Sequence, residues 1–155
     1  MFKPRRINKR LLSIKKKLEE SMIIDHIKKT LVVNKDLHYI ECLVLEKYYQ
    51  GYKIDVNGDV CLAAEGLKQL PKILFRKVKG GFYCTHNNLV SLKHSPKRVD
   101  GNFRCSYNKL VSLKGCPKKV KGYFWCNQKD KIFTEEEINE NCEVLKQGNI
   151  LKSLF

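Results

Sequence analysis

Cysteine and histidine are the residues of this sequence whose side chains could hold a metal ion or act as nucleophiles. The seven cysteines stand at positions 42, 61, 84, 105, 116, 126 and 142, and the four histidines at 26, 38, 86 and 94. No two cysteines are spaced as a CxxC pair, so the pattern favours neither a zinc site nor a closed disulfide framework. An odd number of cysteines without such a framework is typical of a protein in a reducing cytoplasm.

Other signatures of catalysis are missing as well. No GxxxxGK[ST] or GxGxxG loop opens an expected helix. Cys84, Cys105 and Cys126 take inward strand positions, where we expect them to be buried and inert. Cys61 and Cys116 are expected to be exposed, but nothing in the sequence near them favours a reactive thiolate. The sequence therefore predicts a protein that is not an enzyme and has no catalytic residue, no metal and no cofactor.

A short tandem repeat is the strongest pattern in the sequence. Residues 79–99 align with residues 100–120 without a gap, and 12 of the 21 aligned positions are identical. A third, truncated copy begins at residue 121, and a weaker copy with one inserted residue occupies 57–78. Repeats of this kind are typical of proteins in which each copy packs on its neighbours.

Within a copy, the pattern predicts a short strand followed by a turn. Val99, Gly101, Phe103 and Cys105 alternate with polar residues, which is the period of a half-buried strand. Pro117 follows, and because proline does not fit inside a central strand it marks an irregular return. We therefore expect about four coils, each of one strand and one return, with parallel strand pairing and one continuous apolar core.

The FxCxxNxLxxL pattern at this period resembles the leucine-rich repeat in its short bacterial form. Phrases such as GNFRCSYNKLVSLKGCPKKV look more closely like small repeat proteins encoded by bacteriophages, which carry strings of NFxCSxNxLTSLxGxPxxV. The resemblance covers residues 54 to about 138 and implies an α/β solenoid, a leucine-rich-repeat-like stack with a parallel β-sheet. It also implies that Asn87 and Asn108 satisfy backbone groups at the bend. Glu65 and Lys129 replace this asparagine in the first and last copies, so we expect the ladder to be weak at both ends.

The segments on either side of the repeats have the composition of caps. Residues 1–50 carry apolar side chains at helical spacing, which predicts two or three short basic helices packed on the open end of the repeats. The three apolar stripes run over 7–18, 23–31 and 37–49. Thr134 and Glu137 form a T-x-x-E capping box, which predicts a helix from near Glu135 to before Gly148. The expected organisation is an N-terminal helical cap (1–50), a solenoid (51–133) and a C-terminal capping helix with its tail (134–155).

The charge of the chain favours an acidic partner. The sequence holds 31 Lys and Arg against 16 Asp and Glu, a net charge of +15, and residues 51–133 alone carry +12. Because equivalent positions of successive copies should become neighbours in the stack, their basic residues should form a basic ridge. In this basic ridge we expect Lys93 to lie beside Lys114, Lys97 beside Lys118, and Arg98 beside Lys119. The ridge either binds phosphate or an acidic protein, or only keeps the protein in solution.

The outward strand positions supply a second candidate binding surface. Tyr83, Arg104 and Trp125 occupy one column of the expected sheet, and these residue types are enriched at binding hot spots. Neighbouring columns bring Asn102, Tyr123 and Lys121. An alternative remains open, in which Arg104 merely stacks between the two aromatic rings and stabilises its own sheet.

Two classes of function fit these patterns. In the first, the protein is a non-catalytic, phage-encoded interaction protein that binds and inhibits or modulates a host protein or ribonucleoprotein through a basic and aromatic sheet face. A defence complex such as a CRISPR effector is one candidate target. In the second, it binds RNA or DNA directly through the basic ridge and exposed aromatic side chains.

The sequence also bears on location. No apolar run reaches the roughly 18–20 residues that a membrane helix requires, and the basic N-terminus lacks the apolar stretch of a secretory signal. We therefore expect a protein of the bacterial host cytoplasm that does not contact a membrane. The oligomeric state stays open, as does a binding role for residues 1–50 beyond that of a cap.

Overall fold

The computed structural model describes residues 4–145 and 150–151 of the chain. Its helices are α1 (Pro4–Glu19), α2 (Tyr39–Tyr48) and α3 (Glu135–Asn141). Its strands are β1 (Met22–Asp25), β2 (Thr30–Val33), β3 (Leu37–His38), β4 (Lys53–Val56), β5 (Val60–Cys61), β6 (Leu74–Val78), β7 (Phe82–Tyr83), β8 (Arg98–Val99), β9 (Phe103–Arg104), β10 (Lys119–Val120), β11 (Phe124–Trp125), β12 (Glu143–Val144) and β13 (Ile150–Leu151). No helix in these two ranges is long and apolar enough to span a bilayer.

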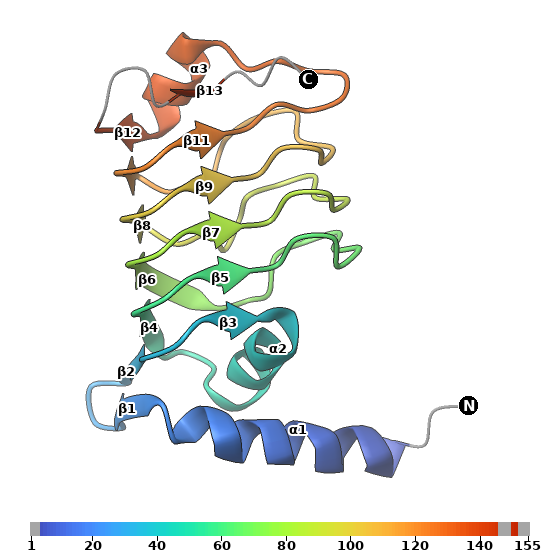
Figure 1. Cartoon of the computed structure of the whole chain (residues 1–155), viewed down its shortest axis with the longest axis vertical. Helices are drawn as coiled ribbons and strands as arrows, with labels where there is room; N and C mark the ends of the chain where they lie inside the picture. Colours follow the sequence, from blue (N-terminus) through green and yellow to red (C-terminus); the bar gives the residue numbers. More distant parts are fainter. Residues whose placement is uncertain (1–3, 146–149, 152–155) are drawn as a thin grey trace.

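The strands form two sheets that run along the length of the molecule (Figure 1). One sheet has seven strands in the order β1-β2-β4-β6-β8-β10-β12, and the other has six in the order β13-β11-β9-β7-β5-β3. Every pairing among the described strands is parallel, apart from the antiparallel pair β1 and β2. The chain thus has an α/β fold with parallel strands in two sheets and three helices in its described part.

Each full repeat copy places one short strand in each sheet. Residues 79–99 hold β7 of the six-stranded sheet and β8 of the seven-stranded sheet, and residues 100–120 hold β9 and β10 in the same way. The sequence predicted a single strand over 99–105, which is wrong because the chain turns a corner at 100–102 between β8 and β9. Gly101 packs there on the corner of the preceding copy, so closely that a Cβ would lie 2.6 Å from the carbonyl carbon of Gly80. Alternation of apolar and polar residues continues through this corner and therefore did not reveal it.

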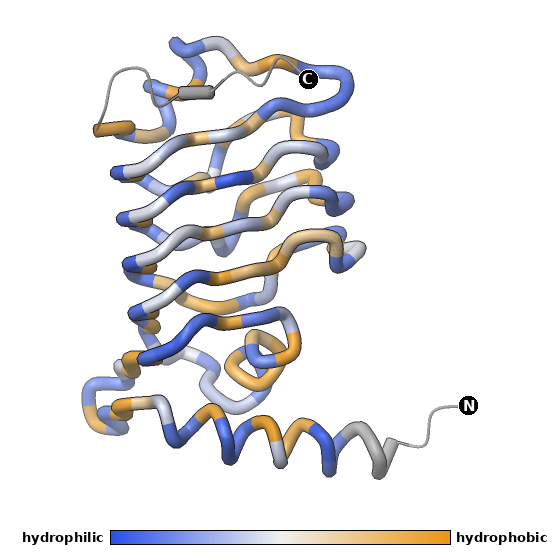
Figure 2. Tube along the Cα trace, viewed as in Figure 1, coloured by the Kyte–Doolittle hydropathy of each residue, from blue (hydrophilic) through white to orange (hydrophobic). Residues whose placement is uncertain are grey.

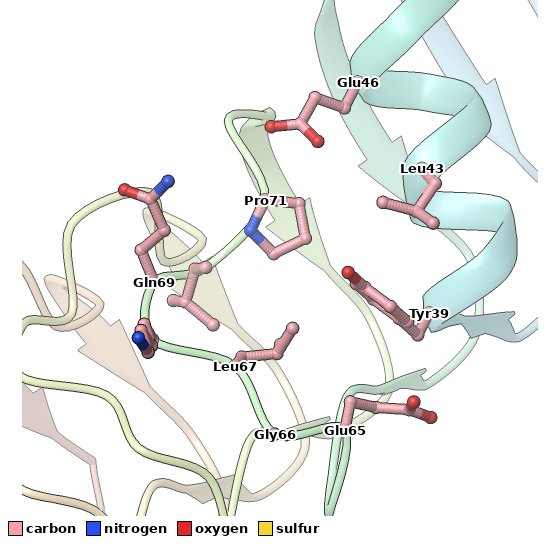
Figure 3. A pocket seen from close by; sticks show the side chains of 10 residues that line it. Tyr39, Leu43, Glu46, Glu65, Gly66, Leu67, Gln69 and Pro71 are labelled. Atoms are coloured by element: carbon pink, nitrogen blue, oxygen red, sulfur yellow. The ribbon is translucent and has the colours of Figure 1, made fainter. Parts of the chain in front are cut away.

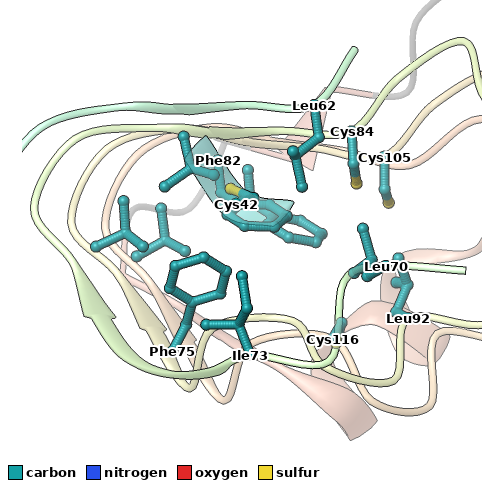
Figure 4. Packing of buried hydrophobic residues seen from close by; sticks show 14 of the residues in the cluster. Cys42, Leu62, Leu70, Ile73, Phe75, Phe82, Cys84, Leu92, Cys105 and Cys116 are labelled. Atoms are coloured by element: carbon teal, nitrogen blue, oxygen red, sulfur yellow. The ribbon is translucent and has the colours of Figure 1, made fainter. Parts of the chain in front are cut away.

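Phenylalanine and cysteine columns fill the space between the two sheets, as the repeat predicts. Phe82, Phe103 and Phe124 hold matching register positions and are fully buried. Their ring centroids are 5.9 and 5.3 Å apart along the stack. Two residues later the cysteines are buried as well, and Figure 4 shows the side chains of Cys84 and Cys105 next to each other in the core.

A ladder of side-chain amides satisfies the backbone where the chain leaves the six-stranded sheet. Asn108 donates from Nδ2 to the carbonyl oxygens of Cys84 and Cys105 at 2.9 and 3.0 Å. Its Oδ1 accepts from the N–H of Leu89 at 3.0 Å. Asn87 makes the equivalent bonds one copy earlier. The role expected for both asparagines is confirmed.

At the last copy the ladder continues through Gln128 instead of weakening at Lys129. Gln128 is buried, donates from Nε2 to the carbonyl oxygens of Cys105 and Cys126 at 3.1 and 2.6 Å, and accepts from the N–H of Asn108 at 2.8 Å. Glutamine has one more methylene group than asparagine, so its amide reaches the same kind of carbonyl from one position earlier. The prediction of a weak ladder is therefore wrong at this end.

The N-terminal segment contains a hairpin where the sequence predicted a helix. α1 and α2 match two of the expected helices, but the stripe at 23–31 forms β1, a turn and the start of β2. Asp25 explains the difference, because its Oδ1 accepts from the N–H groups of Ile27 and Lys28 at 3.0 and 2.8 Å and so reverses the chain. Leu31 then lies in the core, and β2 pairs with β4.

α3 begins with the predicted capping box. Oγ1 of Thr134 accepts from the N–H of Glu137 at 3.1 Å, and Oε2 of Glu137 accepts from the N–H of Thr134 at 2.8 Å. The helix ends at Asn141; position 148, the limit expected from the sequence, lies outside the described residues. Ile138 joins the same core cluster as Leu18 of α1. α3 therefore covers one end of the sheets, and α1 and α2 cover the other (Figure 1).

Candidate functional site

The six-stranded sheet turns one face to the core and one face outward. Because side chains alternate along a strand, the residue after each buried phenylalanine of β7, β9 and β11 projects outward. These residues are Tyr83, Arg104 and Trp125, and the register places Arg104 between the two aromatic residues. All three are half-buried. We call them the Tyr-Arg-Trp row.

The two rings of the row hold the guanidinium between them. Cζ of Arg104 lies 3.8 Å from the ring centroid of Trp125 and 5.5 Å from that of Tyr83. Cation–π contacts of this kind contribute roughly 0.5–2 kcal/mol, depending on how far the charge is removed from water. The self-stacking arrangement that the sequence left open is therefore present, and it fixes the guanidinium in one position.

Arg104 has hydrogen-bonding capacity that the described residues leave unused. Its Nε is buried without a hydrogen-bond partner among them, and none of their ion pairs involves this guanidinium. Oγ of Ser106, two residues further on, is also buried without a hydrogen-bond partner among the described residues. A buried polar group without a partner costs about 1–3 kcal/mol, and such groups are rare in native folds. Arg104 and Ser106 thus each keep hydrogen-bonding capacity that the described residues do not use.

Gly81 allows Tyr83 to take its place in the row. A Cβ on Gly81 would lie 2.2 Å from Oη of Tyr83, so the tyrosine side chain lies over the glycine. Burial raises the pKa of Tyr83, and the carboxylate of Asp59 adds to this effect while Arg104 opposes it. The hydroxyl of Tyr83 is therefore protonated at neutral pH and can donate a hydrogen bond.

Tyr123 and Asn102 extend the row toward the corner of the repeats. Oδ1 of Asn102 accepts from the backbone N–H of Tyr123 at 2.9 Å. The Tyr123 ring is 42% exposed, and its centroid lies 5.5 Å from that of Trp125. Tyr123 is thus an exposed ring beside the row, and Asn102 serves to position its backbone.

A second aromatic pair, which the sequence reasoning did not predict, lies where the chain leaves the same sheet. The exposed rings of His86 and Tyr107 stack with centroids 4.6 Å apart and planes 21° apart. Both residues have a positive φ, 56° and 55°, which turns the chain after the strand. Their equivalent places in two successive copies were the signal that could have identified the pair.

The basic ridge lies apart from the Tyr-Arg-Trp row. Arg98 and Lys119 belong to β8 and β10 of the seven-stranded sheet, whereas the row lies on the six-stranded sheet. The expectation of a single face that is both basic and aromatic is therefore wrong, because the corner at 100–102 separates the two surfaces. Figure 2 shows hydrophilic residues gathered at such corners of the stacked repeats.

Asp100 neutralises part of the positive charge at this corner. Its carboxylate lies 2.8 Å from Arg98, 3.2 Å from Lys77 and 3.4 Å from Lys121. Burial opposes ionisation of Asp100, but the hydrogen bonds from Arg98 and Lys77 outweigh it and hold the pKa of Asp100 below its usual value. Lys121 is thus an ion-pair partner within the protein.

The remaining residues of the basic ridge divide into paired and unpaired lysines. Lys119 lies 3.2 Å from Glu143. Four exposed lysines take part in none of the ion pairs within the described ranges, namely Lys93, Lys97, Lys114 and Lys118. These four are the ridge residues that can meet an external anion.

Burial keeps the core cysteines protonated and unreactive, as expected, but Cys116 differs from its expected exposure. Burial raises the pKa of both Cys84 and Cys126 to about 12, so neither forms a thiolate at neutral pH. Cys116, expected to be exposed, is buried, and its Sγ donates to the carbonyl oxygen of Pro117 at 3.7 Å. Cys61 is half-buried.

Within residues 4–145 and 150–151, no group of three or more His, Cys, Asp or Glu side chains could hold a metal ion.

A hollow of about 310 Å³ lies between α2 and the segment 65–71 (Figure 3). Glu46 and Glu65 stand at opposite sides of it, with Tyr39 and Leu43 from α2 between them. Oε1 of Glu46 already accepts from the backbone N–H of Lys72 at 2.8 Å. The two carboxylates therefore do not converge as a general acid and base would.

Comparison with protein-family models, with curated proteins and with solved structures finds no match to this chain. Its activity must therefore be inferred from its own surfaces, above all from the Tyr-Arg-Trp row.

Proposed function

We propose that this chain is a non-catalytic interaction protein, built as a short leucine-rich-repeat-like solenoid, that grips a partner with the Tyr-Arg-Trp row. Parallel strands at equivalent places of successive copies, in both sheets, support the solenoid. The amide ladder through Asn87, Asn108 and Gln128 supports it further. In a stack of this kind each copy adds one side chain to every outward column, which makes the sheet face a natural binding surface.

The state of Arg104 is the observation that carries this proposal. Its guanidinium is fixed between two rings, and its buried Nε has no partner among the described residues. A group that is already fixed loses little conformational entropy on binding. A guanidinium prefers carboxylate or phosphate, so the best partner presents an acidic group flanked by apolar surface for Trp125 and Tyr123.

The charge of the chain favours an acidic protein surface or a ribonucleoprotein as this partner. A net charge of +15 attracts acidic partners over a distance and speeds their association. The resemblance to phage-encoded repeats favours a target in the bacterial host cytoplasm, which the protein would inhibit or modulate. A defence complex such as a CRISPR effector is one candidate, because it combines protein surface with phosphate.

Direct binding of RNA or DNA is the second candidate, and the His86–Tyr107 stack is the observation that favours it. These two rings are exposed and follow β7 and β9, and the exposed ring of Tyr123 precedes β11 of the same sheet. Unpaired bases stack on such rings with about 1–3 kcal/mol per base. The four unpaired lysines of the basic ridge would then neutralise phosphates.

An affinity capture from bacterial host lysate, with and without nuclease, tests the proposal and separates the two candidates. We expect a captured protein that survives nuclease treatment and is lost with Trp125→Ala. Arg104→Lys, which keeps the charge but not the planar stack, should weaken binding about tenfold or more. The control Lys118→Ala removes an exposed charge from the arc that leads into β10 of the other sheet and should change binding by less than about twofold.

A salt titration of the captured complex gives the decisive contrast. Direct binding of nucleic acid should weaken by roughly 10³–10⁵ between 50 and 200 mM salt if several phosphates are neutralised. An interface centred on Arg104 and Trp125 should respond far less. If both row variants retain full binding, the proposal fails.

A further inference from the structure

A hollow of about 350 Å³ lies on the seven-stranded sheet, at the amino ends of β4, β6 and β8. Lys53 begins β4, Arg76 lies in β6, and His94, Ser95 and Lys97 lie in the arc that leads into β8. We propose that this basic hollow binds a small phosphate monoester that carries an apolar or aromatic body. The site lies on another sheet than the Tyr-Arg-Trp row, and it does not depend on the function proposed for that row.

The charge of the lining favours a phosphate. Arg76 is neutralised by Asp55, which accepts from its Nε at 2.9 Å and also from its Nη2. Lys53 and Lys97 are exposed and take part in no ion pair within the described part of the chain. A phosphate monoester carries about 1.5 to 2 negative charges at neutral pH, so it can satisfy both lysines at once.

The surroundings of His94 add to this positive field. Burial lowers the pKa of His94, and the charges of Lys93 and Lys72 lower it further, against the opposing effect of Glu46. The imidazole is therefore largely neutral at neutral pH, and it can offer one hydrogen-bond donor to a ligand. An anion in the basic hollow would be attracted by Lys93 and Lys72 as well as by the lysines that line it.

Ser95 supplies a hydroxyl that the described residues do not satisfy. Its Oγ is buried without a hydrogen-bond partner among them. The backbone N–H of Ser95 already donates to the carbonyl oxygen of Leu92 at 3.0 Å. The side-chain hydroxyl is therefore the donor of Ser95 that has no partner among the described residues. Buried hydroxyl groups are nearly always paired in native proteins. Ser95 lines the basic hollow, so a rotation about its χ1 presents the hydroxyl to a phosphate oxygen there.

The next repeat copy indicates what the turn itself requires at these two positions. Gly115 stands where the preceding copy has His94, and both residues have a positive φ, +91° and +74°. Glycine takes this conformation without strain, whereas histidine does not. Cys116 stands where that copy has Ser95, and its Sγ donates to the carbonyl oxygen of Pro117 at 3.7 Å. The turn therefore needs neither the imidazole nor the hydroxyl, and both His94 and Ser95 line the hollow.

The inner wall of the basic hollow is apolar. Ile73 and Phe75 are buried, and Leu74 is 51% exposed. The volume lies at the lower end of the range of about 300–1,000 Å³ that is usual for small-molecule sites. We therefore expect an aromatic phosphate to bind better than inorganic phosphate, because its ring can cover the side chain of Leu74.

The test is a calorimetric titration of the full chain with phenyl phosphate at 150 mM salt. We expect saturable binding of one equivalent, with weaker binding of inorganic phosphate and of benzoate. Ser95→Ala and Lys97→Gln should each weaken the binding of phenyl phosphate about fivefold or more. Lys118→Gln is the matched control, because it occupies the same column as Lys97 one copy further on and does not line the hollow; it should change binding by less than about twofold.

Two results would overturn the proposal. One is the absence of saturable binding, and the other is an equal loss with Lys118→Gln and Lys97→Gln, which would indicate attraction to the net charge alone. His94→Gly separates a loss of binding from a loss of folding, because glycine suits the positive φ of this turn. This variant should weaken binding while its melting temperature stays unchanged or rises. Trp125→Ala should bind phenyl phosphate normally, so failure of the row and failure of the basic hollow are distinguishable.

Discussion

Asn108 shows at the scale of one residue how the repeat depends on a buried amide. Its side chain donates to three carbonyl oxygens and accepts from one N–H group, all from the backbone. In Asn108→Ala these groups lose their partners, and each buried group left unpaired costs about 1–3 kcal/mol. We expect the free energy of unfolding, measured by urea denaturation, to fall by about 3 kcal/mol. The exposed Asn88, next to Asn87 in the sequence, is the control, and Asn88→Ala should cost less than about 0.5 kcal/mol; equal losses would contradict the ladder.

Asp100 makes the stability of the corner depend on pH. Its pKa is lowered in the folded protein because the hydrogen bonds from Arg98 and Lys77 outweigh the effect of burial. Because the pKa of Asp100 is lower in the folded protein than in the unfolded chain, its ionised form stabilises the fold at any pH above the unfolded-state pKa. This stabilisation is lost as the pH falls through the pKa of Asp100 in the folded protein. Asp100→Asn should therefore lower the free energy of unfolding by about 1–3 kcal/mol at pH 7.

The difference between Asp100→Asn and the unmodified protein should shrink as pH falls below about 4. Denaturation at pH 7 and pH 3 measures it. Asp130→Asn removes the same charge from an exposed position and should change stability little at either pH. A difference that stays constant down to pH 2 would show that the aspartate acts by shape and not by charge.

At the scale of the element, Gly101 allows neighbouring corners to approach. A Cβ there would lie 2.6 Å from the carbonyl carbon of Gly80, and the N–H of Gly101 donates to the Gly80 carbonyl oxygen at 2.9 Å, so the two backbones cannot easily separate. Gly101→Ala should lower the free energy of unfolding by about 1–3 kcal/mol. Gly81→Ala is the contrast, because the added methyl meets the side chain of Tyr83, which can rotate away.

Thermal unfolding of both glycine variants checks this expectation. Gly101→Ala should have the lower melting temperature, whereas Gly81→Ala should mainly weaken partner binding by moving Tyr83 off Arg104. If Gly81→Ala were the less stable of the two, the close approach of backbones would not be the main constraint at these corners.

The elements also indicate how far the sequence could be interpreted before the structure. Equal spacing was enough to predict that Phe82, Phe103 and Phe124 align, because parallel strands of one register require copies of one length. It could not predict the corner at 100–102, since two short strands with a bend show the same alternation as one long strand. The stripe at 23–31 fits both a helix and a hairpin, and only the turn at Asp25 distinguishes them.

The candidate site was predictable to a similar extent. The equal length of the copies placed Tyr83, Arg104 and Trp125 in one row, and the structure has them there. The row lies on the six-stranded sheet, whereas Arg98 and Lys119 lie on the seven-stranded sheet, because the chain bends at 100–102. The sequence pattern does not show a bend between two short strands. The ion pair of Asp100 with Lys77 was also beyond reach, since it joins residues at non-equivalent positions of two different copies.

For the molecule as a whole, a stack of repeats should transmit a local loss of stability mainly to its neighbours. Thr134→Ala removes the N-cap of α3 and should cost about 1 kcal/mol. β12 follows α3 directly, so hydrogen exchange should quicken at the amides of Glu143 and Leu145, which donate to the carbonyl oxygens of Lys118 and Val120.

The amide of Leu62, several copies away, donates to the Tyr83 carbonyl oxygen at 2.7 Å and should exchange at an unchanged rate in Thr134→Ala. Ser112→Ala, at an exposed position of a return arc, controls for the loss of a hydroxyl group and should alter neither end. A uniform rise in exchange at Glu143 and Leu62 would mean that the chain opens as one unit. In that case the core that joins Leu18 to Ile138 couples the two ends more strongly than nearest-neighbour packing can.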